Sequence, residues 1–173
     1  FEAFPVDISG KNCVDLGCST GGFTQVLLEA GAAHVTAIDV GHGQMAGQLA
    51  ADPRVTLREG LNARDITAND VPQETALIVC DVSFISLTLA LPPLLALVRS
   101  GTQIIALIKP QFEVGRAALG KGGVVRDDAL LTQTCERISA FFLGLGWRVL
   151  GVVSSPITGG DGNREFLIAA QKA

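Results

Sequence analysis

The chain has 173 residues, 48% of them hydrophobic, with a formal net charge of −4 and a mean hydropathy of +0.41. This length allows one well-packed domain, and the acidic balance excludes a domain that holds nucleic acid by bulk positive charge. The longest apolar stretch, Leu87–Val98, is broken by Pro92 and Pro93 and is shorter than the ~20 residues of a membrane-spanning helix. The sequence shows no signal peptide. Because the chain opens on Phe1 rather than Met, we interpret it as a piece of a longer protein.

Short apolar runs alternate with helical segments, a pattern typical of parallel βαβ units. In chain order we expect strands over Asn12–Leu16, His34–Asp39, Val55–Glu59, Leu77–Asp81, Ile104–Lys109, Arg148–Ser154 and Glu165–Ala169. The expected helices cover Gly22–Ala30, Gln44–Ala51, Ile85–Val98 and Asp127–Leu145. The last of these helices has Asp127 or Asp128 as its expected N-cap and Gly146 as its stop.

Only the loop Pro156–Arg164 separates the last two expected strands, which is too short for a helical crossover. The sequence therefore predicts a Rossmann-like α/β fold over residues 1–173. In this fold a seven-stranded, mostly parallel sheet ends in an antiparallel edge hairpin and carries helices on both faces. Seven strands is the usual count of the methyltransferase sheet, and we expect a single domain.

A glycine-rich run, Val14–Phe23, joins the first expected strand to the first expected helix, and Asp39 ends the second strand. A dinucleotide loop needs G-x-G-x-x-G, but Ser19 occupies the middle glycine position. A P-loop needs a lysine after its last glycine, and none follows Gly22. The run therefore predicts a nucleoside-binding crevice whose ligand is not held by its phosphates.

Two carboxylates of this crevice indicate which nucleoside it binds. Asp15 at the strand tip would repel a pyrophosphate but suits the amino group and sulfonium of a cationic cofactor. Asp39 stands where a carboxylate accepts both hydroxyls of a ribose. The pattern favours S-adenosylmethionine; the alternative is that the glycines only make a tight turn and the acids only cap helices or loops.

A second group of polar residues falls where three other expected strands end or begin. Asp81 ends the fourth strand, Lys109 ends the fifth, and Glu165 opens the last. In open α/β sheets the ligand crevice lies beyond the carboxyl ends of the strands. A lysine between two carboxylates can hold a hydroxyl in line with a sulfonium methyl group, as general base or as positioning cation. The alternatives are a helix N-cap for Asp81, a solvated charge for Lys109, and an ion pair with Arg164 for Glu165.

The four cysteines form no C-x-x-C pair and lie apart from both histidines. Neither a zinc site nor a disulfide framework is indicated, so we expect no metal and interpret the thiols as free in a reducing cytoplasm.

Several long segments resemble the TlyA or hemolysin A family of FtsJ-like ribosomal RNA 2′-O-methyltransferases. They cover nearly the whole chain and are Leu16–Thr24, Ile38–Gln44, Asp81–Ser86, Lys109–Arg116, Lys121–Asp127 and Gly162–Phe166.

The resemblance implies a Lys-Asp-Lys-Glu tetrad that acts on the ribose 2′-hydroxyl of a cytidine, with S-adenosylmethionine as methyl donor. Asp81, Lys109 and Glu165 match the last three members of the tetrad. The family's first lysine, and the S4-type RNA-binding domain that precedes its catalytic domain, lie upstream of this chain. Ribosomal RNA or ribosomal subunits are the implied partner.

We expect cofactor contacts from Asp15, Gly17, Ser19, Thr20, Gly21, Gly22, Phe23, Asp39, Val40, Asn62, Ala63 and Asp81. By the resemblance, the Asn62–Asp65 segment runs beside the adenine, and a basic, glycine-rich segment forms a mobile lid over the RNA entrance. The RNA-contact candidates of that segment are Arg116, Lys121 and Arg126. We interpret Phe84 as a core aromatic side chain, with stacking on a base or the cofactor as the alternative.

Three other functions remain open at this point. In amine methylation, Asp81–Phe84 would replace the Asp/Asn-Pro-Pro-Tyr/Phe motif, but the prolines are missing and Lys109 would have no use. A non-catalytic or truncated cofactor-binding module would bind the cofactor without turnover. A pore-forming hemolysin is disfavoured because the sequence offers neither a spanning segment nor a basic amphipathic helix.

Overall fold

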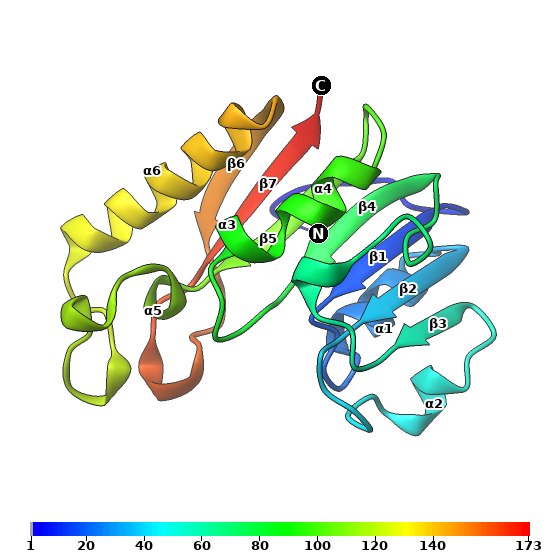
Figure 1. Cartoon of the computed structure of the whole chain (residues 1–173), viewed down its shortest axis with the longest axis horizontal. Coiled ribbons are helices and arrows are strands. Elements are labelled where there is room, and N and C mark those ends of the chain that lie inside the picture. Colours follow the sequence, from blue (N-terminus) through cyan, green and yellow to red (C-terminus); the bar gives the residue numbers. More distant parts are fainter. Residues whose placement is uncertain (1) are drawn as a thin grey trace.

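The computed structural model describes residues 2–173, which form one sheet with helices on both faces (Figure 1). The strands are β1 (Asn12–Leu16), β2 (His34–Ile38), β3 (Val55–Arg58), β4 (Thr75–Cys80), β5 (Gln103–Ile108), β6 (Trp147–Ser154) and β7 (Phe166–Lys172). The α-helices are α1 (Gly22–Glu29), α2 (Gly47–Ala50), α3 (Leu87–Ala90), α4 (Pro92–Leu97), α5 (Pro110–Glu113) and α6 (Asp128–Gly144). The short 3-10 helices are η1 (Ala63–Asp65), η2 (Arg116–Ala118), η3 (Lys121–Gly123) and η4 (Gly160–Gly162).

The sheet has the strand order β3-β2-β1-β4-β5-β7-β6. Strands β1 to β5 pair in parallel, whereas β7 is antiparallel to both β5 and β6. The predicted seven-stranded sheet with an antiparallel edge hairpin is therefore confirmed. The order reverses between β1 and β4, and such a point is where ligands bind in open α/β sheets.

Helices α3, α4 and α6 lie on one face of the sheet, and α1 lies on the other (Figure 1). On the first face, Leu94 of α4 and Phe142 of α6 are fully buried against strand residues such as Ile104. On the second face, Leu27 of α1 is buried against Val35 and its neighbours. The central strands are covered on both faces, which explains their continuous apolar runs.

The single helix expected over 85–98 is wrong. The segment forms two short helices, because Pro92 lacks the N–H that a continuous helix needs and instead opens α4 in its first turn. Ser86 begins α3 by accepting a hydrogen bond from the backbone N–H of Thr88. Because of this break, α3 is a separate short helix that begins where the loop after β4 ends.

Other boundaries differ by a few residues. Strand β7 begins at Phe166 and runs to Lys172, beyond the expected end at Ala169, because it pairs with both β5 and β6. Helix α2 is shorter than predicted. Asp127 is the N-cap of α6, and Gly146, at φ +78°, follows its end as expected.

Because β7 runs against β5, its amino end lies at the carboxyl ends of the parallel strands. Phe166 pairs with Ile108, so the residues just outside this pair, Glu165 and Lys109, come to the same edge. The loops after β1, β2 and β4 reach that edge as well. Among residues 2–173, no helix is both long and apolar enough to cross a membrane.

Candidate active site

The loop after β1 can approach the loop after β4 only because residue 17 is glycine. Gly17 has φ +80°, and a Cβ atom there would lie 2.4 Å from the backbone oxygen of Asp81. An L side chain is disfavoured at this φ and would also collide with the neighbouring backbone. Gly17 therefore sets the spacing between the two loops.

Asp39 ties the loops after β1 and β2 together. Its Oδ2 accepts a hydrogen bond from the Ser19 backbone N–H at 2.8 Å, and its Oδ1 accepts one from the Gly41 N–H at 2.8 Å. Ser19 has φ +47°, which turns its N–H toward the carboxylate. Each carboxylate oxygen keeps a further lone pair, so Asp39 can still accept both hydroxyls of a ribose.

A crevice of about 650 Å³ opens at this edge of the sheet. Among the predicted cofactor contacts, its walls include Gly17, Ser19, Asp39, Val40, Asn62, Ala63 and Asp81. The sequence analysis missed Leu16, Ile38, Gln44, Leu61, Arg64, Val82, Ser83, Ile85 and Leu89, which line it too. The missed residues are mainly apolar neighbours of the predicted ones, so they supply the flat, dry walls that an adenine needs.

The remaining predicted contacts, Asp15, Thr20, Gly21, Gly22 and Phe23, are not among the residues that line the crevice, and their contact with the cofactor stays a prediction. The side chain of Phe23 packs against the core formed by α1 and the sheet. At Gly21, where φ is +100°, a Cβ atom would meet Leu49, so this glycine serves packing of the loop.

Asp15 is buried, with 0% of its surface exposed, and one of its oxygens accepts a hydrogen bond from the Thr24 hydroxyl at 2.7 Å. Burial raises the pKa of the Asp15 carboxyl to about 6, and the nearby carboxylates of Asp81 and Asp39 raise it further. The other oxygen, Oδ1, is buried without a hydrogen-bond partner. Asp15 therefore links β1 to the first turn of α1 from behind the crevice and does not form its wall.

Lys109 and Asp81 meet at the rim of the crevice. Lys109 Nζ lies 2.6 Å from Asp81 Oδ1 and donates a hydrogen bond to Ser83 Oγ at 2.9 Å. The lysine side chain is 12% exposed and that of Asp81 is 34% exposed, so the pair is sheltered but open to a ligand. Neither alternative reading holds: Asp81 caps no helix here, and Lys109 is not a freely solvated charge.

Glu165 is also buried at this edge, but its carboxylate contacts a residue that the sequence analysis did not single out. Gln111 donates a hydrogen bond from Nε2 to Glu165 Oε1 at 3.0 Å. Arg164 forms its ion pair with Asp128, which excludes the expected alternative for Glu165. The motif that supplies Lys109 also contains Gln111, two positions later, and that spacing was the available signal.

Phe84 is not a core residue, and that expectation was wrong. Its side chain is 89% exposed, it lies in the crevice wall, and its backbone has φ +64°. The ring packs on that of Phe112 of α5, with centroids 4.8 Å apart. A left-handed conformation is costly for an aromatic residue, and such strain clusters at functional sites.

The basic segment between α5 and α6 carries Arg116, Lys121 and Arg126 as exposed side chains. Its carboxyl-terminal part is anchored: Asn163, from the β6–β7 connection, accepts a hydrogen bond from Val125 N–H and donates one to the Gly123 carbonyl. Buried Asn163 thus ties residues 123–125 to the β6–β7 connection, and a mobile lid over Arg116–Arg126 stays a prediction.

The described part of the chain contains no group of three or more His, Cys, Asp or Glu side chains arranged to hold a metal ion. All four cysteines are free. Burial raises the pKa of the Cys18 thiol, within the glycine-rich run Val14–Phe23, to about 12. A thiol with such a pKa is a poor nucleophile near neutral pH.

A model of the FtsJ-like methyltransferase family matches residues 1–172. The chain belongs to the FtsJ-like methyltransferase family. This FtsJ-like chain is 46% identical over 167 residues to the 16S/23S rRNA (cytidine-2′-O)-methyltransferase TlyA of Mycobacterium tuberculosis, covering 96% of the chain and 62% of that relative. It is 40% identical over 168 residues to hemolysin A of Brachyspira hyodysenteriae, covering 96% of the chain and 70% of that relative.

Two solved structures share the fold. A Lactococcus lactis protein provisionally described as a hemolysin superposes on the FtsJ-like chain with a TM-score of 0.95 and 43% identity, covering 99% of this chain and 83% of that one. An S-adenosylmethionine-dependent methyltransferase from Mesorhizobium loti shares the fold, with a TM-score of 0.70 at 16% identity over 99% of this chain and 95% of that one. The FtsJ-like chain spans about 62% of the length of the Mycobacterium relative.

Proposed function

We propose that this chain carries the catalytic site of an S-adenosylmethionine-dependent ribosomal RNA methyltransferase that modifies the ribose 2′-hydroxyl of a cytidine. One observation carries the proposal: the Lys109–Asp81 pair, at 2.6 Å, stands at the rim of the crevice that the glycine loop and Asp39 form. A nucleoside crevice and a hydroxyl-positioning pair at one rim are what methyl transfer to a ribose requires.

The residues present fit S-adenosylmethionine. Asp39 retains lone pairs for two ribose hydroxyls, and the apolar side chains of Leu61, Val82 and Leu89 line the crevice as walls for an adenine. No lysine or arginine of the glycine loop is available to pair with phosphates. When bound, this cofactor supplies an electrophilic methyl group on a sulfonium.

Lys109 is proposed to hold the 2′-hydroxyl of the acceptor ribose in place. Its Nζ already contacts Asp81 and Ser83, so the ammonium is fixed in direction before RNA arrives. Methyl transfer is an in-line displacement, and orientation supplies much of its acceleration. Glu165, held by Gln111 at the same edge, is proposed to lie close to that hydroxyl and to interact with it as a polar neighbour.

The RNA is proposed to approach over the exposed side chains of Arg116, Lys121 and Arg126, which would contact phosphates. The exposed ring of Phe84 offers a flat surface on which a base can stack. The relatives named as rRNA methyltransferases support ribosomal RNA or ribosomal subunits as the partner, and thus the cytoplasm as the compartment.

We propose further that residues 1–173 are one methyltransferase domain of a longer protein. The Mycobacterium relative has additional chain, since the match spans 62% of its length. The resemblance implies that an upstream lysine and an S4-type domain complete the tetrad and supply further phosphate contacts. The acidic net charge of −4 is consistent with phosphate contacts that come in part from that upstream domain.

The test is transfer of a labelled methyl group from S-adenosylmethionine to ribosomal subunits, followed by mapping of the modified nucleotide. The chain is assayed alone and joined to the amino-terminal RNA-binding part of the Bacillus subtilis relative. We expect the label on a cytidine 2′-oxygen. A label on a base amine would favour amine methylation, and cofactor binding without transfer by either protein would favour a non-catalytic module.

A further inference from the structure

We propose that Glu113 is a positioning residue that locks the loop after β4 to the segment after β5 and thereby sets the distance between Asp81 and Lys109. The inference rests on the proposed function for its catalytic consequence, but the contacts that carry it are independent of any substrate. Glu113 ends α5, and its side chain is only 1% exposed.

Glu113 contacts the amino end of α3 with both carboxylate oxygens. Oε2 accepts a hydrogen bond from the Ser86 hydroxyl at 2.6 Å, and Oε1 accepts one from the Leu87 backbone N–H at 2.8 Å. Ser86 is the N-cap of α3 and ends the loop that starts at Asp81. Glu113, which is distant in the sequence, therefore fixes the end of the loop Asp81–Ser86 that lies farthest from Asp81.

The two segments are joined at three successive places. Lys109 meets Asp81 and Ser83, the Phe112 ring packs on Phe84 with centroids 4.8 Å apart, and Glu113 binds Ser86 and Leu87. The contacts follow the same order along both segments, so the segments run side by side from the crevice rim into the protein. The Glu113 side chain is 1% exposed, against 12% for Lys109 and 34% for Asp81.

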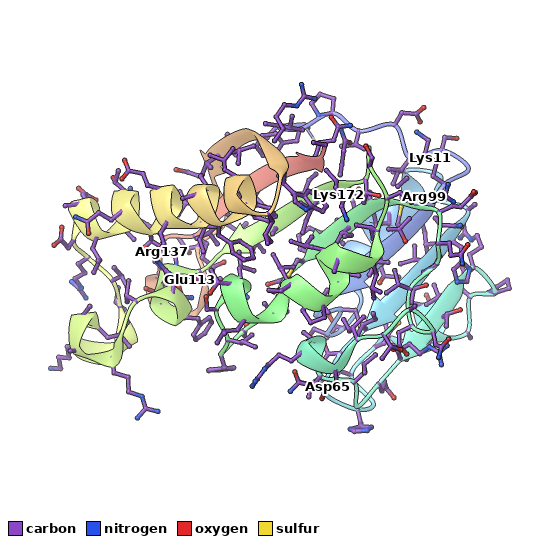
Figure 2. The ribbon with its side chains drawn as sticks, turned by 45° about the horizontal axis from the view of Figure 1, so that its top comes forward. Lys11, Asp65, Arg99, Glu113, Arg137 and Lys172 are labelled. Carbon is purple, nitrogen blue, oxygen red and sulfur yellow. The ribbon has the colours of Figure 1, made fainter. Side chains whose placement is uncertain are left out.

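Arg137 of α6 holds Glu113 from the other side. Its Nη2 donates to the Glu113 backbone carbonyl at 2.8 Å and lies 3.1 Å from Oε2 (Figure 2). A buried carboxylate without partners is strongly unfavourable. The partners of Glu113 come from two other places in the chain, the amino end of α3 and helix α6. Glu113 is thus a rigid junction, and no part of the proposed chemistry needs it as an acid, base or ligand contact.

The direct test is Glu113→Gln, which keeps the size but replaces one accepting oxygen with an amide that cannot accept from Ser86 or Leu87. We expect kcat for methyl transfer to fall roughly 10- to 100-fold, since small misplacements of reacting groups cost that much. The Kd of S-adenosylmethionine should change much less than kcat, because Asp39, the expected acceptor of the ribose hydroxyls, is held by Ser19 and Gly41 and not by this junction.

Lys172→Met is the matched control. Lys172 Nζ donates to the Leu95 and Val98 carbonyls at the end of α4, at the opposite edge of the sheet from Lys109. Figure 2 shows Lys172 beside Arg99, away from Glu113 and Arg137. Removing its charged hydrogen bonds lowers stability as well, but we expect kcat to stay within about twofold of the unmodified protein.

Hydrogen exchange provides a readout that needs no activity. In Glu113→Gln, peptides spanning residues 81–88 and 109–114 should exchange faster, whereas the glycine loop and β2 should not. Unchanged exchange in these peptides would overturn the inference, and so would faster exchange with unchanged kcat. If the unmodified protein transfers no methyl group, the proposed function fails, while the exchange experiment still decides whether Glu113 couples the two segments.

Discussion

Lys109 Nζ lies 2.6 Å from Asp81 Oδ1, although the two residues follow different strands and are 28 positions apart. The strands β4 and β5 are parallel neighbours, with Cys80 paired to Ala106, so their carboxyl ends meet at one edge. Parallel pairing alone brings the two residues near each other. The two connecting segments also contact each other beyond the ion pair, through the rings of Phe84 and Phe112 and through Glu113 at the amino end of α3.

Replacing Lys109 with alanine should lower kcat for methyl transfer by at least about 100-fold, because the 2′-hydroxyl then loses its positioning group. The Kd of S-adenosylmethionine should change less than about threefold, since Lys109 does not line the crevice. Single-turnover kinetics and calorimetry measure the two quantities. Lys11→Ala, at the opposite edge of the sheet, is the control, and equal loss of cofactor binding and transfer in Lys109→Ala would contradict this division of roles.

Asp39→Ala should weaken S-adenosylmethionine binding by about 10- to 100-fold. The substitution removes the expected acceptor of the ribose hydroxyls and also frees the Ser19 and Gly41 N–H groups from their anchor. Calorimetric titration measures the change. Asp52→Ala, an acid beside β3 that pairs only with Arg54 in the described structure, should bind the cofactor normally. Unchanged affinity in Asp39→Ala would remove Asp39 from the site.

Gly17→Ala should destabilise the fold by about 2–5 kcal/mol, because strain at φ +80° adds to a collision with the Asp81 backbone. Gly10→Ala separates the two causes: Gly10 has φ +71°, but no atom lies within 4 Å of its Cβ position. That variant should lose only about 1–2 kcal/mol. Urea unfolding of both variants measures the difference, and equal losses would show that the contact with Asp81 is unimportant.

The buried carboxyl of Asp15 should make the folded protein less stable as the pH rises from about 4 to about 6. Its pKa is about 6 in the folded protein and 3.8 ordinarily, so within this range the folded state binds more protons than the unfolded state. The loss is on the order of 3 kcal/mol and persists above pH 6.

Asp15→Asn should remove that pH dependence while its side-chain oxygen still accepts from Thr24. Unfolding free energies in urea at pH 4, 5, 6 and 7 test this. Asp70→Asn is the control: hydrogen bonds from Thr67 lower the pKa of the Asp70 carboxyl, so its stabilising effect is lost only as the pH falls below its ordinary pKa of 3.8. Between pH 4 and 7 that variant should keep the pH dependence of the unmodified protein. Parallel pH curves for Asp15→Asn and the unmodified protein would contradict the account.

The sequence was sufficient for the seven strands and the antiparallel hairpin, because each strand is an apolar run and the loop Pro156–Arg164 is too short for a helical crossover. It also predicted that Asp39, Asp81, Lys109 and Glu165 lie at one edge of the sheet, since residues at the carboxyl ends of strands converge in any open α/β sheet; their roles stay predictions. The sequence did not show which side chains of a motif face the crevice and which face the interior. Asp15 and Phe23 belong to the same motif as Gly17, yet they face the interior, and no spacing distinguishes a motif residue that faces the crevice from one that supports it.

The errors at α3, α4 and Phe84 have a different cause. The hydrophobic run 87–98 is typical of one helix. It forms two short helices because Ser86 caps the first and Pro92 opens the second. Phe84 is apolar, so burial was the natural expectation, but its place depends on contact with Phe112, which is distant in the sequence. The sequence analysis did not single out Glu113, because its partners Ser86, Leu87 and Arg137 come from two other places in the chain.

Calorimetric titration of the chain with S-adenosylmethionine tests the central claim most directly, with NAD and ATP as controls. The account predicts saturable binding of one S-adenosylmethionine per chain, lost in Asp39→Ala, and no binding of either control nucleotide. Equal binding of all three ligands, or no binding of S-adenosylmethionine, would contradict the assignment of the crevice.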